Sequence, residues 1–224
     1  MPELQRRDEI CVLDLGDDEN RFSLDWLTSV NGLLDEVSKQ STPRALVTMA
    51  QGKFYSNGLD LDWVLTHRDQ VDAYVADVQA LLARMLALPM PTVAAVTGHA
   101  FGAGSMLAMA HDWRVMRADR GFFCFPEVDI RLPFTPGMAA LIQAKLTPAT
   151  ALTAMTTGRR YGGQEALTAG LVDLAVPEAE VVTRAIDLVR PLAGKDPGTL
   201  GAIKATMYAV EIAALQRPSA VTLP

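Results

Sequence analysis

The stretch from Pro91 to Ala110 reads PTVAAVTGHAFGAGSMLAMA and contains no Asp, Glu, Lys or Arg. Twenty such residues are long enough to cross a bilayer as a helix, and Gly98 and Gly102 have the spacing of a helix-dimer motif. Gly and Ala dominate the stretch, however, and a proline opens it. It fits better as a buried strand over Thr92–Val96, a glycine-rich loop over Gly98–Gly104 and a short buried helix. We therefore predict no membrane-spanning segment.

The composition indicates an acidic globular protein. Of the 224 residues, 50% are hydrophobic and 21% are charged, which supports a sizeable core and argues against disorder. The formal charge of −6 lacks the basic surplus that nucleic-acid-binding proteins show. Two cysteines and three histidines leave no disulfide scaffold and little for a metal cluster. We expect no nucleic-acid partner, no metal site and no permanently bound cofactor.

We expect no targeting signal at either end of the sequence. The first residues, from Glu3 to Glu9, are largely charged where a signal peptide would be apolar. The last residues do not form a peroxisomal signal of the Ser-Lys-Leu type. These observations favour a cytoplasmic location.

A strand, a glycine loop and a helix in this order also occur in dinucleotide-binding domains. That fingerprint requires G-x-G-x-x-G, and the glycines at 98, 102 and 104 do not match it. Asp119 follows at a distance suited to the acid that binds a ribose. Without the glycine motif, we do not favour the nucleotide-binding interpretation.

Hydrophobic patterning divides the chain into two parts. In the first part the pattern predicts strands over 9–15, 44–49, 92–96, 114–116 and 121–125, helices over 23–39 and 69–88, and a polar loop over 51–58. In the second it predicts helices over 136–145, 147–156, 163–168, 177–192 and 198–215, and one strand over 171–175. Such alternation predicts an α/β fold with helices covering parallel strands. We expect a single domain over 1–224, with a core over about 1–135 and a helical layer over about 136–224.

Three motifs occur in a characteristic order: Ser56-Asn-Gly-Leu-Asp60, the glycine-rich segment Gly98–Gly104, and Phe125-Pro-Glu127. From about residue 9 to about 190, the chain resembles the crotonase superfamily of enoyl-CoA hydratases and isomerases. It is most similar to the monofunctional Δ3,Δ2-enoyl-CoA isomerases. The resemblance implies a crotonase-like spiral of ββα units with a helical C-terminal layer that serves in trimerisation. It also implies a homotrimer or homohexamer and an acyl-CoA thioester substrate, with coenzyme A as part of that substrate.

Acyl-CoA chemistry at C2 passes through a thioester enolate, whose oxygen needs preorganised hydrogen-bond donors. Backbone N–H groups at a loop or a helix N-terminus can supply them, and glycines allow the backbone to approach the thioester closely. The resemblance places one donor at Leu59 and the other at Ala103. The alternative is that the glycines only permit tight packing between strand and helix.

Hydratases of this family use two glutamates. The resemblance places Met106 where the first would stand and Glu127 where the second stands. An isomerase needs only one base, which removes a proton from C2 and returns it to C4. The apolar residues around Glu127 are expected to raise its pKa. We therefore expect an enoyl-CoA isomerase with Glu127 as the base; enoyl-CoA hydratase or another crotonase reaction and a non-catalytic acyl-CoA binder stay open as alternatives.

Further residues are expected to contact the substrate. They are Lys53, Ser56, Asn57, Gly58, Asp60, Leu61, Gly102, Gly104, Met106 and Pro126.

Other charged residues compete for roles at the site. Asp129 would share a face with Glu127 if the segment were extended, as a second acid or simply as an exposed one. Arg159, Arg160 and Lys53 are candidates for the phosphates of coenzyme A, with a solvated surface role as the alternative. His111 ends a helix, where it suits the helix dipole, and we expect it to be structural.

Overall fold

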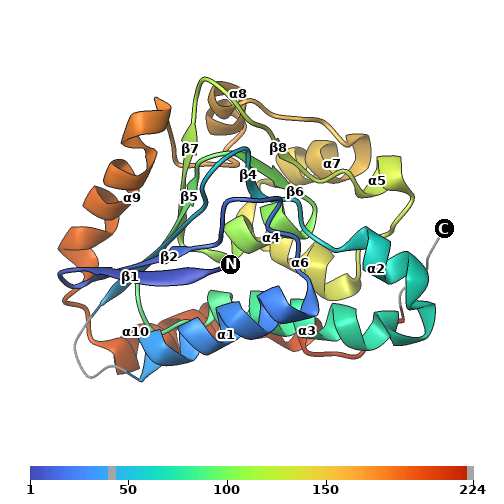
Figure 1. The fold of residues 1–224 in the computed structure, drawn as a ribbon, viewed down its shortest axis with the longest axis horizontal. Helices are drawn as coiled ribbons and strands as arrows, with labels where there is room; N and C mark the ends of the chain where they lie inside the picture. Colours follow the sequence, from blue (N-terminus) through green and yellow to red (C-terminus); the bar gives the residue numbers. More distant parts are fainter. Residues whose placement is uncertain (40–43, 221–224) are drawn as a thin grey trace.

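The computed structural model describes residues 1–39 and 44–220, which form two sheets surrounded by helices (Figure 1). The larger sheet has the order β1-β2-β3-β5-β7-β9 and is parallel except for the β1–β2 hairpin. Its strands are β1 (Glu3–Arg7), β2 (Ile10–Asp14), β3 (Ala45–Met49), β5 (Thr92–Val96), β7 (Trp113–Arg117) and β9 (Leu174–Val176). The smaller parallel sheet consists of β4 (Phe54–Ser56), β6 (His99–Phe101) and β8 (Phe123–Cys124).

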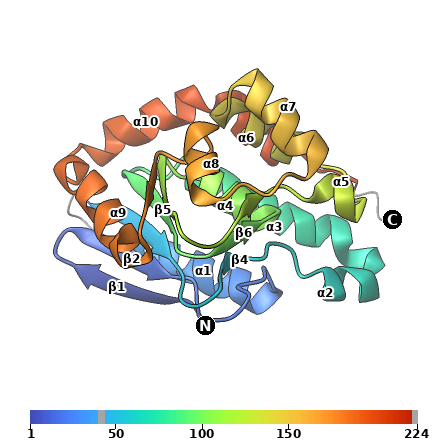
Figure 2. The same cartoon turned by 90° about the horizontal axis from the view of Figure 1, so that it is seen from above.

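Helices occupy most of the second half of the chain and the connections of the first. They are α1 (Leu24–Ser38), α2 (Leu61–Thr66), α3 (Val71–Leu86), α4 (Ala103–Ala110), α5 (Glu127–Ile130), α6 (Pro136–Lys145), α7 (Pro148–Thr157), α8 (Gly163–Thr168), α9 (Val181–Val189), α10 (Pro197–Met207) and α11 (Ala209–Leu215). Short 3₁₀ turns lie at Arg68–Gln70, Glu178–Glu180 and Arg190–Leu192. Figure 2 places α10 and α6 on the side of the molecule opposite β1. No helix in the described part of the chain has both the length and the apolar character needed to cross a membrane.

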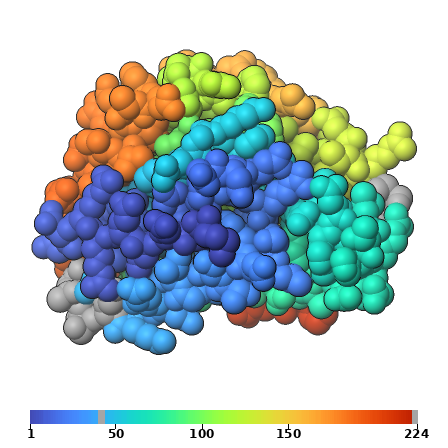
Figure 3. All heavy atoms as spheres, in the orientation of Figure 1, coloured from blue at the N-terminus to red at the C-terminus, as the bar shows by residue number. Residues whose placement is uncertain are grey.

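The central strands are buried on both faces, which explains the long uncharged stretch. On one face, residues such as Val93 and Ala95 pack against α9 in a cluster of their own. On the other face, Ala94 and Val96 belong to the main core beneath α1, α3 and α4. Successive strand residues point to opposite faces, so both sets must be apolar. In Figure 3 the N-terminal residues (blue) lie between α9 (orange) at the left and α2 (teal) at the right.

The repeated unit of the fold is strand, strand, helix. The units are β3-β4-α2, β5-β6-α4 and β7-β8-α5, and in each the first strand joins the large sheet and the second joins the small one. Because β4, β6 and β8 are parallel neighbours, the segments that follow them leave from the same edge. The expected spiral of ββα units is therefore present, and it brings the three sequence motifs together.

Several elements match the predictions closely and others do not. The strand over 92–96 and the helices over 136–145 and 163–168 have the predicted bounds. The predicted loops over 51–58 and 98–104 were only partly right, because each contains a three-residue strand of the small sheet. The single helix predicted over 198–215 is interrupted at Tyr208. The division near residue 135 and the role of the later helices in trimerisation stay predictions.

His111 has the structural role expected of it, but through buried hydrogen bonds rather than through the helix dipole. His111 is fully buried, and burial lowers its pKa to about 3. Its Nδ1 lies 2.8 Å from the Leu107 carbonyl oxygen and must donate to it, which leaves Nε2 to accept from the Thr48 hydroxyl at 2.9 Å. The Tyr55 hydroxyl extends this series of hydrogen bonds and lies 2.7 Å from Thr48 Oγ1. The imidazole is therefore a neutral structural group.

The later helices are attached to the core by a buried ion pair. Lys204 Nζ of α10 lies 2.6 Å from Asp112 Oδ2 and donates to the Met90 carbonyl oxygen at 2.7 Å. Asp112 also accepts from the Thr92 backbone N–H at 2.8 Å. The cation that pairs with Asp112 thus comes from a helix far away in the chain.

Candidate active site

The first two motifs meet backbone to backbone. Gly58 has a φ of +77°, and a Cβ atom there would stand 2.8 Å from the Ala103 nitrogen and 2.7 Å from the Phe101 carbonyl oxygen. A Cβ atom on Gly104 would collide with the Ser56 carbonyl oxygen. Glycine is thus required where the segment after β4 crosses the start of α4.

Two backbone N–H groups are free at this crossing. Gly58 N–H donates to Ser56 Oγ at 3.1 Å and Asp60 N–H donates to the Tyr74 hydroxyl at 2.9 Å. Between them, Leu59 N–H has no protein acceptor among residues 1–39 and 44–220. The same holds for Ala103, the first residue of α4, whose N–H precedes the first helical hydrogen bond. The two residues that the resemblance named as donors are therefore side by side and available.

Glu127 begins α5, and its carboxylate is buried with only 7% of the residue exposed. Its Oε2 atom is buried without a hydrogen-bond partner in the described structure. Burial raises the pKa of Glu127 from its ordinary value of 4.5 to about 7. Gly102, with a φ of +53°, faces the carboxylate: a Cβ atom there would stand 3.4 Å from Glu127 Oε1. A carboxyl group in this state can exchange a proton near neutral pH.

Two cavities meet at Glu127. The first, which we call the mouth cavity, has a volume of about 290 Å³. It is lined by Arg21, Asn57, Leu59, Leu61, Asp62, Phe101, Gly102, Ala103, Cys124, Pro126, Glu127, Ile130, Leu132 and Arg160. The second, the inner cavity, has a volume of about 30 Å³. It is lined by Leu59, Val75, Ala103, Met106, Glu127, Leu132, Pro133, Phe134, Thr135 and Met138.

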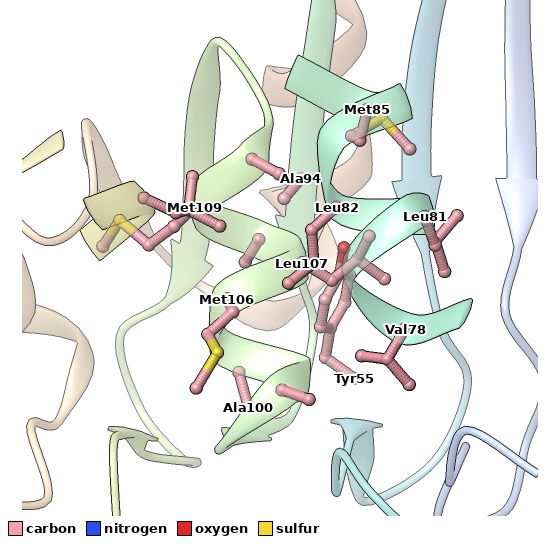
Figure 4. Packing of buried hydrophobic residues seen from close by; sticks show 14 of the residues in the cluster. Tyr55, Val78, Leu81, Leu82, Met85, Ala94, Ala100, Met106, Leu107 and Met109 are labelled. Carbon is pink, nitrogen blue, oxygen red and sulfur yellow. The ribbon is translucent and has the colours of Figure 1, made fainter. Parts of the chain in front are cut away.

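Leu59, Ala103, Glu127 and Leu132 line both cavities, so these residues lie where the two cavities adjoin, which we call the junction. Among the residues that line the inner cavity, Glu127 alone ionises near neutral pH. Met106 lines this cavity and is 1% exposed. Figure 4 shows its thioether pointing away from the labelled α3 side chains, whereas Leu107 faces them. The wall that would hold a second carboxylate in a hydratase is therefore apolar.

Most of the other expected contact residues surround this junction, but not all line a cavity. Asn57, Leu61, Gly102 and Pro126 line the mouth cavity. Neither cavity is lined by Ser56, Gly58, Asp60 or Gly104, which hold the surrounding backbone in place. Ser56 Oγ donates to the Asn20 carbonyl oxygen at 2.7 Å. The Asp60 side chain accepts from Trp63 N–H and so caps α2. Lys53 is exposed and lines neither cavity, and its Nζ stands 5.1 Å from the centre of the Phe54 ring.

The extended geometry expected for Asp129 was wrong. Residues 127–130 form a helical turn, in which side chains two positions apart do not share a face. Asp129 is exposed, lies against Gly158 and lines neither cavity. It therefore does not serve as a second acid beside Glu127.

Sequence reasoning missed Arg21 and Leu132 in the walls. Arg21 comes from the loop between β2 and α1, and its guanidinium lies 2.5 Å from both Glu19 Oε2 and Asp62 Oδ2. No motif marked it, because its role depends on the crossing of two distant loops. Arg160, a candidate from the sequence, does line the mouth cavity, and its guanidinium stacks 5.7 Å from the Phe101 ring centre.

Comparisons with known proteins agree with this geometry. The family model described as enoyl-CoA hydratase/isomerase matches residues 5–221. Enoyl-CoA delta isomerase 2, peroxisomal, of Arabidopsis thaliana is 39% identical over 203 residues, which are 86% of this chain and 85% of that protein. Enoyl-CoA delta isomerase 3 of the same plant is 38% identical over 201 residues, covering 86% and 84%.

Solved structures show the same architecture. A probable enoyl-CoA hydratase from Mycobacterium tuberculosis superposes with a TM-score of 0.90 at 26% identity, covering 97% of this chain and 92% of that one. Human mitochondrial delta3-delta2-enoyl-CoA isomerase gives a TM-score of 0.87 at 21% identity, with 96% and 85% covered, and is similar in fold alone. With the strand–strand–helix units and the motif order, these matches establish that the chain belongs to the enoyl-CoA hydratase/isomerase family and has the crotonase fold.

Proposed function

We propose that the protein is a Δ3,Δ2-enoyl-CoA isomerase, which moves a double bond of an acyl-CoA thioester from C3 to C2. The observation that carries the proposal is the junction of the two cavities. One buried carboxylate, Glu127, lines both cavities together with Leu59 and Ala103, whose N–H groups have no acceptor in the described structure, and Met106 lines the inner cavity. The similarity to enoyl-CoA delta isomerases over most of both chains supports this choice of reaction.

The proposed reaction uses each of these groups once. The thioester carbonyl oxygen accepts hydrogen bonds from Leu59 N–H and Ala103 N–H, which stabilise the negative charge as it develops. The Glu127 carboxylate takes a proton from C2, and the electron pair is delocalised over the thioester and the C3–C4 double bond. The protonated Glu127 then returns the proton to C4, which leaves the double bond between C2 and C3. No atom is gained or lost, and one base is enough.

The surroundings of Glu127 suit this exchange. Burial raises the pKa of its carboxyl to about 7, so near neutral pH the group can both accept a proton and release it. In the described structure no protein donor bonds Oε2, so no hydrogen bond there stabilises the charged carboxylate and opposes the rise in its pKa. A low-dielectric site also strengthens the two N–H dipoles that face the thioester oxygen.

Coenzyme A enters the proposal only as part of the substrate, and no permanently bound cofactor is needed. The mouth cavity is the larger of the two and carries Arg160 in its wall, which suits the anionic part of such a thioester. Arg21, by contrast, is already paired with Glu19 and Asp62. We therefore assign the coenzyme A side of the substrate to the mouth cavity.

Hydration is the second candidate reaction, because carnitinyl-CoA dehydratase of Escherichia coli is 34% identical over 164 residues. A catalytically silent acyl-CoA binder is the third. Assays with 3-enoyl-CoA and 2-enoyl-CoA on the wild type and on Glu127→Gln separate the three. We expect isomerisation in the wild type and at least a 10²-fold loss in Glu127→Gln, since the amide cannot act as a base.

Asp129→Asn is the matched control, because it alters an exposed acid on the same helix and is expected to keep full activity. Hydration that survives Glu127→Gln contradicts the isomerase proposal. Acyl-CoA binding without turnover of either substrate supports the silent binder.

We also propose a homotrimer or homohexamer in the cytoplasm. The assembly follows from the family resemblance and is tested by measuring the mass of the native protein in solution. Buried free thiols at Cys11 and Cys124 suit a reducing compartment. The two relatives named as peroxisomal make cell fractionation the necessary test of the location.

A further inference from the structure

The inner cavity is far smaller than the mouth cavity. A cavity needs about 10–15 Å³ to hold one water-sized group. The inner cavity, with a volume of about 30 Å³, therefore holds roughly two such groups. A methylene group is close to water in size. The cavity therefore admits about two carbon atoms beyond the reacting atoms at the junction.

Buried side chains from three helices form the walls of this cavity. They are Val75 of α3, Met106 of α4 and Met138 of α6, which are exposed by 3%, 1% and 5%. A hydrogen-bonded bridge fixes the distance between two of these helices. Thr135 Oγ1, at the start of α6, donates to Gln79 Oε1 of α3 at 2.7 Å and accepts from Met138 N–H at 3.2 Å. The distance between α3 and α6 thus cannot increase here without breaking buried hydrogen bonds.

A further helix closes the space behind α6. A Cβ atom on Gly137 would stand 2.6 Å from the Leu215 Cα atom of α11, and α11 contacts both α6 and α3. The backbones of α6 and α11 are in contact at Gly137, which leaves no channel between these two helices there. A chain that extended past Met138 toward Gly137 would therefore meet packed backbone.

We propose that the substrates are short, straight-chain 3-enoyl-CoA thioesters of about six carbons. This inference rests on the proposed function for the position of the reacting atoms. Carbons one to four lie at the junction beside Glu127, and the remaining two fill the inner cavity. Longer chains must displace Met138 or Phe134 from the wall.

A chain-length series tests the proposal directly. We expect kcat/KM for 3-dodecenoyl-CoA to be at least about 10-fold below that for 3-hexenoyl-CoA, which is the discrimination that a closed apolar pocket can supply. Equal values for the two substrates would overturn the proposal, since they would require room that the described cavity lacks.

Two wall variants identify the cause of the discrimination. Met138→Ala and Phe134→Ala each enlarge the cavity, and we expect each to raise the dodecenoyl-to-hexenoyl ratio of kcat/KM by about 5-fold or more. Phe134 is only partly buried, so its variant keeps the test available if Met138→Ala fails to fold. Met109→Ala is the matched control: it truncates a buried methionine that lines neither cavity and should leave the ratio unchanged.

Binding measurements separate this inference from the proposed reaction. Calorimetry with the saturated analogues hexanoyl-CoA and dodecanoyl-CoA needs no turnover. If no 3-enoyl-CoA is isomerised but hexanoyl-CoA binds more tightly, the reaction is wrong and the chain-length inference stands. If isomerisation occurs but dodecanoyl-CoA binds as tightly as hexanoyl-CoA, the chain-length inference is wrong and the reaction stands.

Discussion

Gly58 and Ala103 contact each other through their backbones, with only 2.8 Å between the Ala103 nitrogen and the place where a Gly58 Cβ would stand. The contact brings Leu59, the next residue, close to Ala103, and both residues line the same two cavities. We predict that Gly58→Ala moves these donors apart and lowers kcat by about 10²-fold or more, the usual effect of losing an oxyanion donor. Steady-state kinetics with a 3-enoyl-CoA substrate checks this.

Gly194→Ala is the control for that variant, because a Cβ atom there would meet nothing within 4 Å. It should retain full activity. A fully active Gly58→Ala enzyme would show that the two N–H groups are not the donors.

The raised pKa of Glu127 predicts how activity depends on pH. Only the carboxylate can remove a C2 proton, so kcat/KM should rise as the pH increases through about 7 and then level off. A pH profile of the wild-type reaction measures this midpoint. A midpoint near 4.5, the ordinary value for a glutamate, would contradict the buried, unpartnered carboxylate described above.

The same pKa predicts the pH dependence of stability. The folded state holds the Glu127 proton up to about pH 7, whereas the unfolded state releases it near 4.5, so Glu127 reduces stability as the pH rises from 4.5 through 7. Glu127→Gln removes this dependence. The free energy of unfolding of the variant minus that of the wild type should therefore be about 3 kcal/mol larger at pH 8 than at pH 4. Urea unfolding at both values tests this, and an equal difference at both would contradict it.

Met106 determines the polarity of the inner cavity. We predict that Met106→Glu places a second carboxylate beside Glu127, raises the pKa of the pair by like-charge repulsion, and shifts the isomerase midpoint above pH 7. The variant should also gain measurable hydration of 2-enoyl-CoA, because the second acid can act on water. Met106→Gln controls for polarity without charge. The same midpoint in Met106→Glu as in the wild type would exclude contact between the two carboxylates.

The ion pair of Lys204 with Asp112 should be important for stability. Lys204→Met leaves a largely buried carboxylate without its cation, and we predict a loss of about 3 kcal/mol in the free energy of unfolding. The exposed Lys195→Met should change it by less than about 0.5 kcal/mol. Denaturant titration compares the two. The double variant with Asp112→Asn should recover part of the loss, because the uncompensated charge is gone.

Local patterns were enough to predict the parts of the fold whose signals lie in adjacent residues. The helix at 136–145 starts with a Thr cap and a proline in its first turn, and its bounds were predicted correctly. Strand β1 was missed because it is an edge strand, with exposed and charged residues such as Arg6 and Arg7. Two strands of the small sheet, β4 and β6, were missed because three residues give no periodic pattern, whereas β8 lies within the strand predicted over 121–125.

The site was predictable where a motif marks it and not elsewhere. The positions of Leu59, Ala103 and Glu127 around one junction follow from three motifs that the parallel small sheet brings together. The contribution of Arg21 and Leu132, and the packing of α11 against α6 behind the inner cavity, depend on contacts between segments far apart in the chain. No local pattern contains that information, and the helical geometry of 127–130 likewise became visible only in three dimensions.

The donors proposed at Leu59 and Ala103 are main-chain rather than side-chain groups, and this determines which substitutions the site can tolerate. Almost any substitution at either residue retains its N–H group; proline alone removes it. The proposed anion-stabilising half of the site should thus tolerate most substitutions at these two residues themselves. Changes at side chains such as Met106 remain free to alter the reaction or the substrate. A single gene duplication followed by one or two substitutions could therefore redirect the chemistry without rebuilding the catalytic framework.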